Sequence, residues 1–242
     1  MFTDFGVTGP YVGQMEAVLH ENTQGIPIVS LMHDAPRFQP MLGAYLLAAY
    51  SQYFPDDAVF LCVIDPGVGD PQRRGAIVQT DRHWFVGPDN GLFNVVASRA
   101  SEVHWWDIEW PQLVSESFHG RDIFAPVAAL LASGESPPAE EANPQHRILP
   151  NWQADLARII YIDVYGNCIT GIRFHEYMCA SVVRTRAVTL RYARTFCESP
   201  KGQAFFYRNA NGLLEIAVNQ GDAANSLGMK IGDTIDLLTT SE

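Results

Sequence analysis

The sequence predicts an α/β domain with a mainly parallel sheet, followed by a smaller all-β, barrel-like domain. Its 242 residues are 47% hydrophobic, which is enough apolar surface for two cores. Strand-like apolar runs alternate with helical segments over residues 1–135, as in a sheet covered on both faces. From residue 153 onward, short strand-like runs are separated by turn residues, which is typical of an antiparallel barrel or sandwich.

The first elements of the α/β domain are marked by their Val, Ile and Phe content. Met1–Phe5, Ile26–Leu31 and Ala58–Ile64 each read as a strand, because near-continuous apolar residues are typical of strands buried on both faces. Pro40–Tyr53 predicts a helix that is apolar around most of its surface, so we expect this helix to be buried.

A hairpin and two helices are expected to complete this domain. Gly75–Thr80 and Trp84–Gly87 read as two strands joined by the polar turn Asp81–His83. Leu92–Arg99 and Ile123–Ser133 have helical patterns. We therefore expect a first domain at residues 1–135.

Residues 136–152 are predicted to connect the domains, because this segment is rich in Pro, Ser, Glu and Ala. The second domain is then expected at 153–242. Its predicted strands are Ile159–Asp163, Cys168–Ile172, Ser181–Arg186, Ala204–Arg208, Leu214–Val218 and Thr234–Leu238. Asn211-Gly212 is a hairpin signal, and Asp222–Leu227 predicts a short helix capped by Asp222 and closed by Gly228.

The composition argues against nucleic-acid-binding, zinc-binding and membrane-spanning proteins. A formal net charge of −11 argues against a broad nucleic-acid surface, which would be basic. The four cysteines are widely spaced, which favours reduced thiols over a zinc site. No signal peptide is recognisable, and the longest apolar runs, Met41–Tyr50 and Ala58–Ile64, are too short to span a bilayer. We expect a soluble, cytoplasmic protein.

Acidic residues follow several strand-like runs of the first domain. Asp4, Asp65 and Asp89 each stand where such a run gives way to a glycine-bearing loop, the usual ligand-binding end of an α/β sheet. Asp4 suits a ribose diol or simply caps a turn. Asp65, with Arg73 and Arg74 close behind it, is either part of a ligand site or a structural turn with a surface ion pair.

His119 stands at the mouth of the helix near Ile123, so it is either a histidine satisfied by that helix or a catalytic group. A carboxylate, an arginine and a histidine together can orient and polarise a water molecule. The sequence contains no Gly-x-Ser-x-Gly, His-Glu-x-x-His or phosphate-binding loop motif.

The second domain carries its own polar cluster. Asp163, Tyr165 and Asn167 lie within five residues, which suits an amino-acid ammonium and a purine, or an ordinary hairpin turn. Asn219 precedes the predicted short helix.

In order along the chain, these segments resemble the S-adenosyl-L-methionine (SAM) hydroxide adenosyltransferases, adenosine-forming SAM hydrolases that are related to the SAM-dependent fluorinase and chlorinase. The resemblance covers residues 1 to about 235. It rests on the motifs Thr3–Gly6, Asp65–Gly69, Gly87–Gly91, Phe118–Asp122, Asp163–Asn167 and Glu215–Gly221.

The resemblance implies a trimer, with SAM between the first domain of one subunit and the second domain of its neighbour. Its catalytic set falls on Asp65, Arg73 and His119, with Arg74 as the alternative arginine. The resemblance also assigns substrate contacts: Asp4 to the ribose hydroxyls, Phe38 beside the ligand, Asp163 to the methionine ammonium, and Asn167 to adenine. We count Tyr165 and Asn219 with these substrate-binding residues.

Departures from the halogenases favour water as the nucleophile. Asp65 replaces a tyrosine, and Gly120 replaces a serine that contacts the halide; a carboxylate repels a halide but accepts a proton from water. Ala210 and Asn211 replace a Ser-Arg pair that helps hold the methionine carboxylate.

We therefore predict hydrolysis of SAM to adenosine and L-methionine. The sulfonium leaves as a neutral thioether, so no metal and no cofactor are expected. The alternatives are a SAM-dependent halogenase and a non-catalytic SAM or adenosine binding module.

Overall fold

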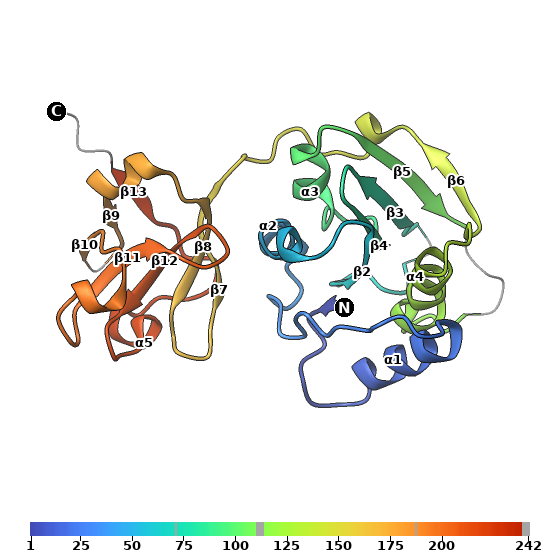
Figure 1. The fold of residues 1–242 in the computed structure, drawn as a ribbon, viewed down its shortest axis with the longest axis horizontal. Coiled ribbons are helices and arrows are strands. Elements are labelled where there is room, and N and C mark those ends of the chain that lie inside the picture. Colours follow the sequence, from blue (N-terminus) through green and yellow to red (C-terminus); the bar gives the residue numbers. More distant parts are fainter. Residues whose placement is uncertain (71, 110–113, 187, 239–242) are drawn as a thin grey trace. The chain divides into compact units, whose positions relative to one another are not determined.

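The computed structural model describes residues 1–70, 72–109, 114–186 and 188–238, and the chain divides into two compact units (Figure 1). The units are Met1–Trp152 and Gln153–Glu242. The first is an α/β layer structure and the second is all-β apart from short helices, so the predicted fold class is confirmed. Within the described ranges, no helix is both long and apolar enough to cross a membrane.

The first unit is built on a six-stranded sheet in the order β1-β2-β4-β3-β5-β6. The strands are β1 (Phe2–Thr3), β2 (Ala58–Val63), β3 (Gly75–Thr80), β4 (His83–Pro88), β5 (Val103–Ile108) and β6 (Ala139–Ala142). β1, β2 and β4 pair in parallel, whereas β3 is antiparallel to both β4 and β5, and β6 to β5. Thus β1, β2, β4 and β5 run one way, and the carboxyl ends of β1, β2 and β4 share one edge.

Helices cover both faces of this sheet (Figure 1). They are α1 (Tyr11–Asn22), α2 (Pro40–Tyr50), α3 (Asn94–Arg99) and α4 (Ala125–Ala132), with short 3₁₀ turns at Ser51–Tyr53 and Pro144–His146. Leu61 and Val63 of β2 pack with α1 and α4, whereas Phe60 packs on the other face against Phe85. Burial on both faces explains the continuous apolar run in this strand.

A π-helical turn, Gly120–Phe124, leads into α4. Pro126 lies in the first turn of α4, where it cannot donate a backbone hydrogen bond. The predicted helix Ile123–Ser133 is present, but the helical segment begins three residues earlier, at Gly120, and its first turn is π-helical. Such π turns occur frequently at functional sites, and this one begins directly after His119.

The sequence-based strand at Ile26–Leu31 is wrong. This segment is extended and Leu31 donates to the Met1 carbonyl, but among the described residues the bridge to β1 here is formed by Met32, one residue after the predicted strand. Pro27 has no N–H to donate, and β1 is only two residues long. The segment therefore has few partners with which to form a ladder of hydrogen bonds. The helix α1 and the strands β5 and β6 were not predicted.

Residues 136–152, expected as a connection, belong to the first unit in the structure. Within them β6 pairs with β5, and Leu149 exchanges hydrogen bonds with the side chain of Asn94. Trp152 stacks on Tyr45 of α2, with ring centroids 6.3 Å apart. This proline-rich segment therefore packs on the first unit. The division between the two units falls after Trp152.

The second unit contains two antiparallel sheets, β11-β12-β8-β7 and β10-β9-β13. Its elements are β7 (Leu156–Ile162), β8 (Cys168–Arg173), β9 (Val182–Arg184), β10 (Thr189–Arg191), β11 (Ala204–Arg208), β12 (Leu213–Val218), α5 (Ala223–Leu227) and β13 (Asp236–Leu238), with 3₁₀ turns at Glu176–Ala180 and Phe196–Glu198. Single bridges, Arg158 to Thr234 and Tyr192 to Phe206, join the sheets at both edges. The strands therefore close into the expected barrel-like ring.

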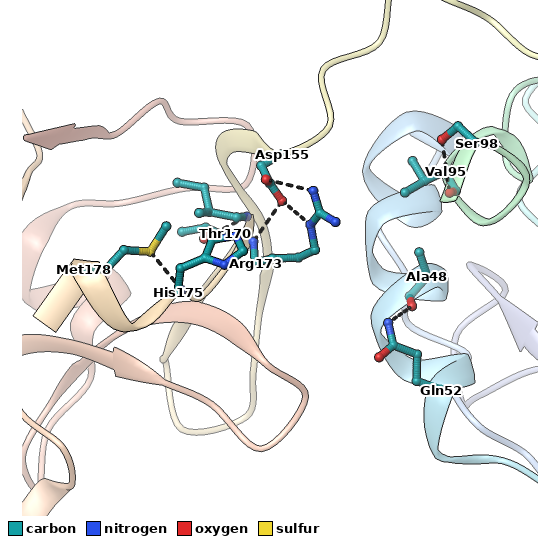
Figure 2. A network of polar contacts seen from close by, with 10 residues as sticks. Ala48, Gln52, Val95, Ser98, Asp155, Thr170, Arg173, His175 and Met178 are labelled. Atoms are coloured by element: carbon teal, nitrogen blue, oxygen red, sulfur yellow. Dashed lines mark hydrogen bonds and ion pairs between the residues drawn. The ribbon is translucent and has the colours of Figure 1, made fainter. Parts of the chain in front are cut away.

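An ion pair that joins the start of β7 to the end of β8 and the caps of α5 stabilise the second unit. Asp155, just before β7, accepts hydrogen bonds from Nε and Nη2 of Arg173 at the end of β8, at 2.7 and 3.1 Å (Figure 2). Asp222 caps α5 by accepting from the Asn225 N–H at 2.7 Å, and Gly228 ends it in the left-handed conformation. This cap and C-terminal glycine are the ones predicted from the sequence.

Candidate functional site

Three carboxylates gather at the shared edge of β1, β2 and β4. Asp4 follows β1, Asp65 follows β2 and Asp89 follows β4. Burial raises the pKa of each of them, and Asp65 further raises the pKa of Asp4 by charge repulsion, so these two carboxylates are neighbours. The parallel strands therefore bring together the acids that the sequence separates.

Asp65 is enclosed at the end of β2. Its side chain is 5% exposed and accepts a hydrogen bond from the Gly67 N–H at 3.2 Å. Burial raises its pKa, while that hydrogen bond and the charges of Arg73 and His119 act in the opposite direction. A buried carboxylate with a raised pKa is a better proton acceptor than a solvated one.

The two candidate arginines point to different partners. Arg73 Nε lies 3.9 Å from Asp65 Oδ1, and its guanidinium packs so closely on Gly67 that an added Cβ there would overlap it. Arg74 instead donates to Asp89 Oδ2 at 3.2 Å and also approaches Asp107. In this structure Arg73 is the arginine beside Asp65.

His119 is buried and precedes the π-helical turn. Burial lowers its pKa, and the negative charges of Asp65 and Asp122 partly oppose that shift. Since Asp65 and His119 each act on the pKa of the other, they lie within electrostatic range. Asp65, Arg73 and His119 thus form one cluster although more than fifty residues separate its ends.

Asp4 and Phe38 are joined directly. Asp4 Oδ2 accepts the Phe38 N–H at 2.9 Å, and Phe38 has a positive φ of 61°, a conformation that L-residues adopt at a cost. The Phe38 side chain is 72% exposed. The carboxylate therefore holds an aromatic ring outward beside the acidic edge of the sheet.

The predicted residues of the second unit form a single loop between β7 and β8. Asp163 Oδ1 accepts the N–H groups of Tyr165 and Asn167, at 2.9 and 2.8 Å, and Oδ2 accepts the Asn167 side-chain amide at 2.9 Å. Tyr165 is 73% exposed, whereas Asn167 is buried. Asp163 thus organises this loop, the role that the hairpin-turn interpretation assigns to it.

Asn219 ends the neighbouring strand β12 and donates its side-chain amide to the Ser199 carbonyl at 2.7 Å. Ala210 and Asn211 lie in the turn between β11 and β12.

Two groups of polar residues were given no role from the sequence, although Asn90 and Glu215 lie in motifs that carry the resemblance. Buried Glu215 of β12 accepts hydrogen bonds from the Tyr207 hydroxyl at 2.5 Å and from the Asn209 amide at 2.9 Å. In the first unit, Asn90 donates to the Ile64 carbonyl at 2.8 Å and so fixes the backbone just before Asp65. The signal for Asn90 was its place in the motif Gly87–Gly91, and the signal for Glu215 was its place at the start of the motif Glu215–Gly221.

No group of three or more His, Cys, Asp or Glu side chains takes a metal-binding arrangement in the part of the chain that the structure describes.

The chain is thus a two-unit α/β and β-barrel-like protein, with an acid–arginine–histidine cluster at the strand ends of its first unit. Residues 1–141 match the family model of the SAM hydroxide adenosyltransferase N-terminal domain, and residues 157–236 match that of the C-terminal domain. The chain belongs to the SAM hydroxide adenosyltransferase family, as its motifs indicated.

Several relatives of this chain are named (R)-S-adenosyl-L-methionine hydrolase. One from Thermus thermophilus is 36% identical, over 98% of this chain and 97% of its own length. One from Salinispora arenicola is 32% identical, over 96% and 94%. A solved structure of an uncharacterised conserved protein from Thermotoga maritima superposes with a TM-score of 0.87, at 30% identity and 98% coverage of both chains.

Proposed function

We propose that this protein hydrolyses SAM to adenosine and L-methionine. Membership of the SAM hydroxide adenosyltransferase family and the names of its relatives support this reaction. The observation that carries the proposal at the residue level is the cluster of Asp65, Arg73 and His119 at the carboxyl end of β2.

In this reaction a water oxygen forms a bond to C5′ of the ribose while the C5′–S bond breaks and its electron pair goes to sulfur. Methionine leaves as a neutral thioether, so the leaving group needs no general acid. Asp65 and His119 orient the water, one of the two takes the single proton that the water loses, and Arg73 balances the negative charge of the Asp65 carboxylate. Burial keeps competing water from these groups, and binding of SAM beside them places the nucleophile opposite sulfur.

Substrate binding is assigned to residues around this cluster and on the second unit. Asp4 receives the ribose hydroxyls, and Phe38 packs beside the ligand. Asp163 binds the methionine ammonium, while Asn167 and Tyr165 contact adenine and Asn219 lines the same region. A carboxylate has about four lone-pair directions, so Asp163 can hold its loop and still accept from an ammonium.

The active unit is proposed to be a homotrimer with SAM between subunits. Large apolar side chains flank the substrate-binding residues and are strongly exposed, among them Val7 at 82% and Val164 at 90%. Such exposure favours surfaces that a ligand or a partner covers. We further propose that the protein works in the cytoplasm without metal or cofactor.

Incubation of the purified protein with SAM, followed by chromatography, should yield adenosine and methionine in equal amounts. Asp65→Asn and His119→Asn should each lower turnover by about 10²-fold or more while SAM still binds, because they remove proton acceptors and leave the pocket shape. Binding without any product would instead indicate a SAM or adenosine binding module.

A halogenase is not favoured. Gly120 is packed against Met15, Phe118 and Phe5, so the site of the halogenase serine presents apolar walls. Addition of chloride or fluoride to the same reaction should give no 5′-halo nucleoside.

A further inference from the structure

A hollow of about 540 Å³ lies on the first unit, away from the acidic edge of the sheet. Its lining residues come from β3, β4, β5 and β6, from the end of α4 and the chain that follows it, and from Asp57 just before β2. Trp84 lies at the start of β4, whereas Asp89 follows the end of the same strand. The length of β4 therefore separates this hollow from the proposed catalytic cluster.

Two tryptophans form its apolar wall. Trp84 and Trp106 stack with ring centroids 5.6 Å apart and planes 24° from parallel. They project from strands on either side of β3, whose Ile77 also lines the hollow. Indole rings attract cations more strongly than other aromatic side chains do, so a wall of two such rings favours a positively charged ligand.

The ionisable side chains that line the hollow are acids. Asp57 and Glu135 line it, and its described lining includes no lysine, arginine or histidine. The guanidinium of Arg82, two residues before Trp84, donates to Asp56 at 2.7 Å and to two backbone carbonyls. His104, which stacks on Trp106 with ring centroids 6.0 Å apart, pairs with Glu102 at 3.2 Å. The carbonyl end of α4, where Glu135 N–H bonds back to Leu130, also carries partial negative charge.

We propose that this hollow binds a small organic cation with a quaternary ammonium or sulfonium head. Stacked indoles receive the apolar, positively charged head, and Asp57 and Glu135 balance its charge. An anion would meet two carboxylates, and a neutral ligand would gain nothing from them. The proposal is independent of the hydrolase reaction, because none of these residues belongs to the catalytic cluster.

Titration with choline chloride at constant ionic strength, followed by calorimetry and tryptophan fluorescence, tests this site. We expect saturable binding with a dissociation constant of order 1 mM. The neutral molecule of the same shape, 3,3-dimethylbutan-1-ol, should bind about tenfold more weakly or not at all, because it lacks the charge. Saturating adenosine, which should occupy the proposed active site, should leave choline binding unchanged.

Substitutions of the lining residues test whether choline binds in this hollow. The double variant Asp57→Asn/Glu135→Gln and the single variant Trp84→Phe should each weaken choline binding about three- to tenfold. Glu140→Gln, an exposed change on β6 outside the lining, is the matched control and should leave affinity unaltered. Absence of saturable binding, equal binding of the neutral analogue, competition by adenosine or insensitivity to the double variant would each overturn the proposal.

Discussion

Burial shifts the pKa values of Asp65 and His119, the two ionisable partners of the proposed catalytic cluster, in opposite directions. A carboxylic acid is neutral when protonated and an imidazole when deprotonated, so an apolar environment raises the pKa of Asp65 and lowers that of His119. At neutral pH His119 is then uncharged and available to accept a proton. The positive charge of Arg73 lowers the pKa of Asp65 and so opposes part of the effect of its burial.

The pH dependence of kcat/KM should report these groups in the free enzyme. Activity should fall as pH is lowered, because His119 gains a proton at a pH below its ordinary range and Asp65 gains one at a pH above the usual value of about 4 for an aspartate. The acid limb should move to higher pH in Arg73→Ala, because loss of the guanidinium raises the pKa of Asp65 further. An unchanged limb in that variant would separate Arg73 from Asp65.

Arg73 and Arg74 should differ in effect although they are neighbours. Arg73→Ala should lower kcat by about 10²-fold, the size of losing one charge-stabilising group. Arg74→Ala should leave kcat within a few-fold and instead lower the free energy of unfolding by about 1 kcal/mol, because it loses the contact to Asp89. Steady-state kinetics and urea unfolding of both variants decide the assignment, and the reverse pattern would transfer the role to Arg74.

At the scale of elements, the site depends on the close approach of β2 and β4. Gly87 of β4 faces the Cys62 carbonyl of β2, and an added Cβ would overlap that oxygen and press on Phe93. Glycine is therefore required at this position by packing and not by an unusual φ. The adjacent strand end carries Asp65, so the spacing of these strands sets the geometry of the acidic edge.

Gly87→Ala should destabilise the protein by about 1–3 kcal/mol, the usual cost of forcing a carbon into a filled core, and should lower activity by displacing Asp65. Gly13→Ala is the control, since this helical glycine of α1 has nothing within 4 Å of the new Cβ and should gain about 0.5–1 kcal/mol. Urea denaturation measures both. Equal stability of the two variants would contradict the packing argument.

Elements with strong local signals were predicted well. The hairpin of β3 and β4 and the cap of α5 at Asp222 follow from turn and capping residues. β6 was missed because its sequence, Ala-Glu-Glu-Ala, has no strand preference and becomes a strand only by pairing with β5.

At the scale of the whole molecule, sedimentation equilibrium should give the mass of a trimer at concentrations where SAM is hydrolysed. The physical reason is the large exposed apolar surface beside the substrate-binding residues of each unit, which includes Phe38 and Tyr165. A fully active monomer would contradict the proposed arrangement.

The sequence by itself determined the two-unit fold class, the family and the residue types of the site, because apolar periodicity, turn chemistry and short motifs are local properties of the chain. The tertiary structure decided how the barrel-like ring closes, where residues 136–152 belong and which arginine lies beside Asp65. Neighbouring residues such as Arg73 and Arg74 have the same chemistry. Only the path of the loop past Gly67 and Asp89 directs one side chain to each carboxylate.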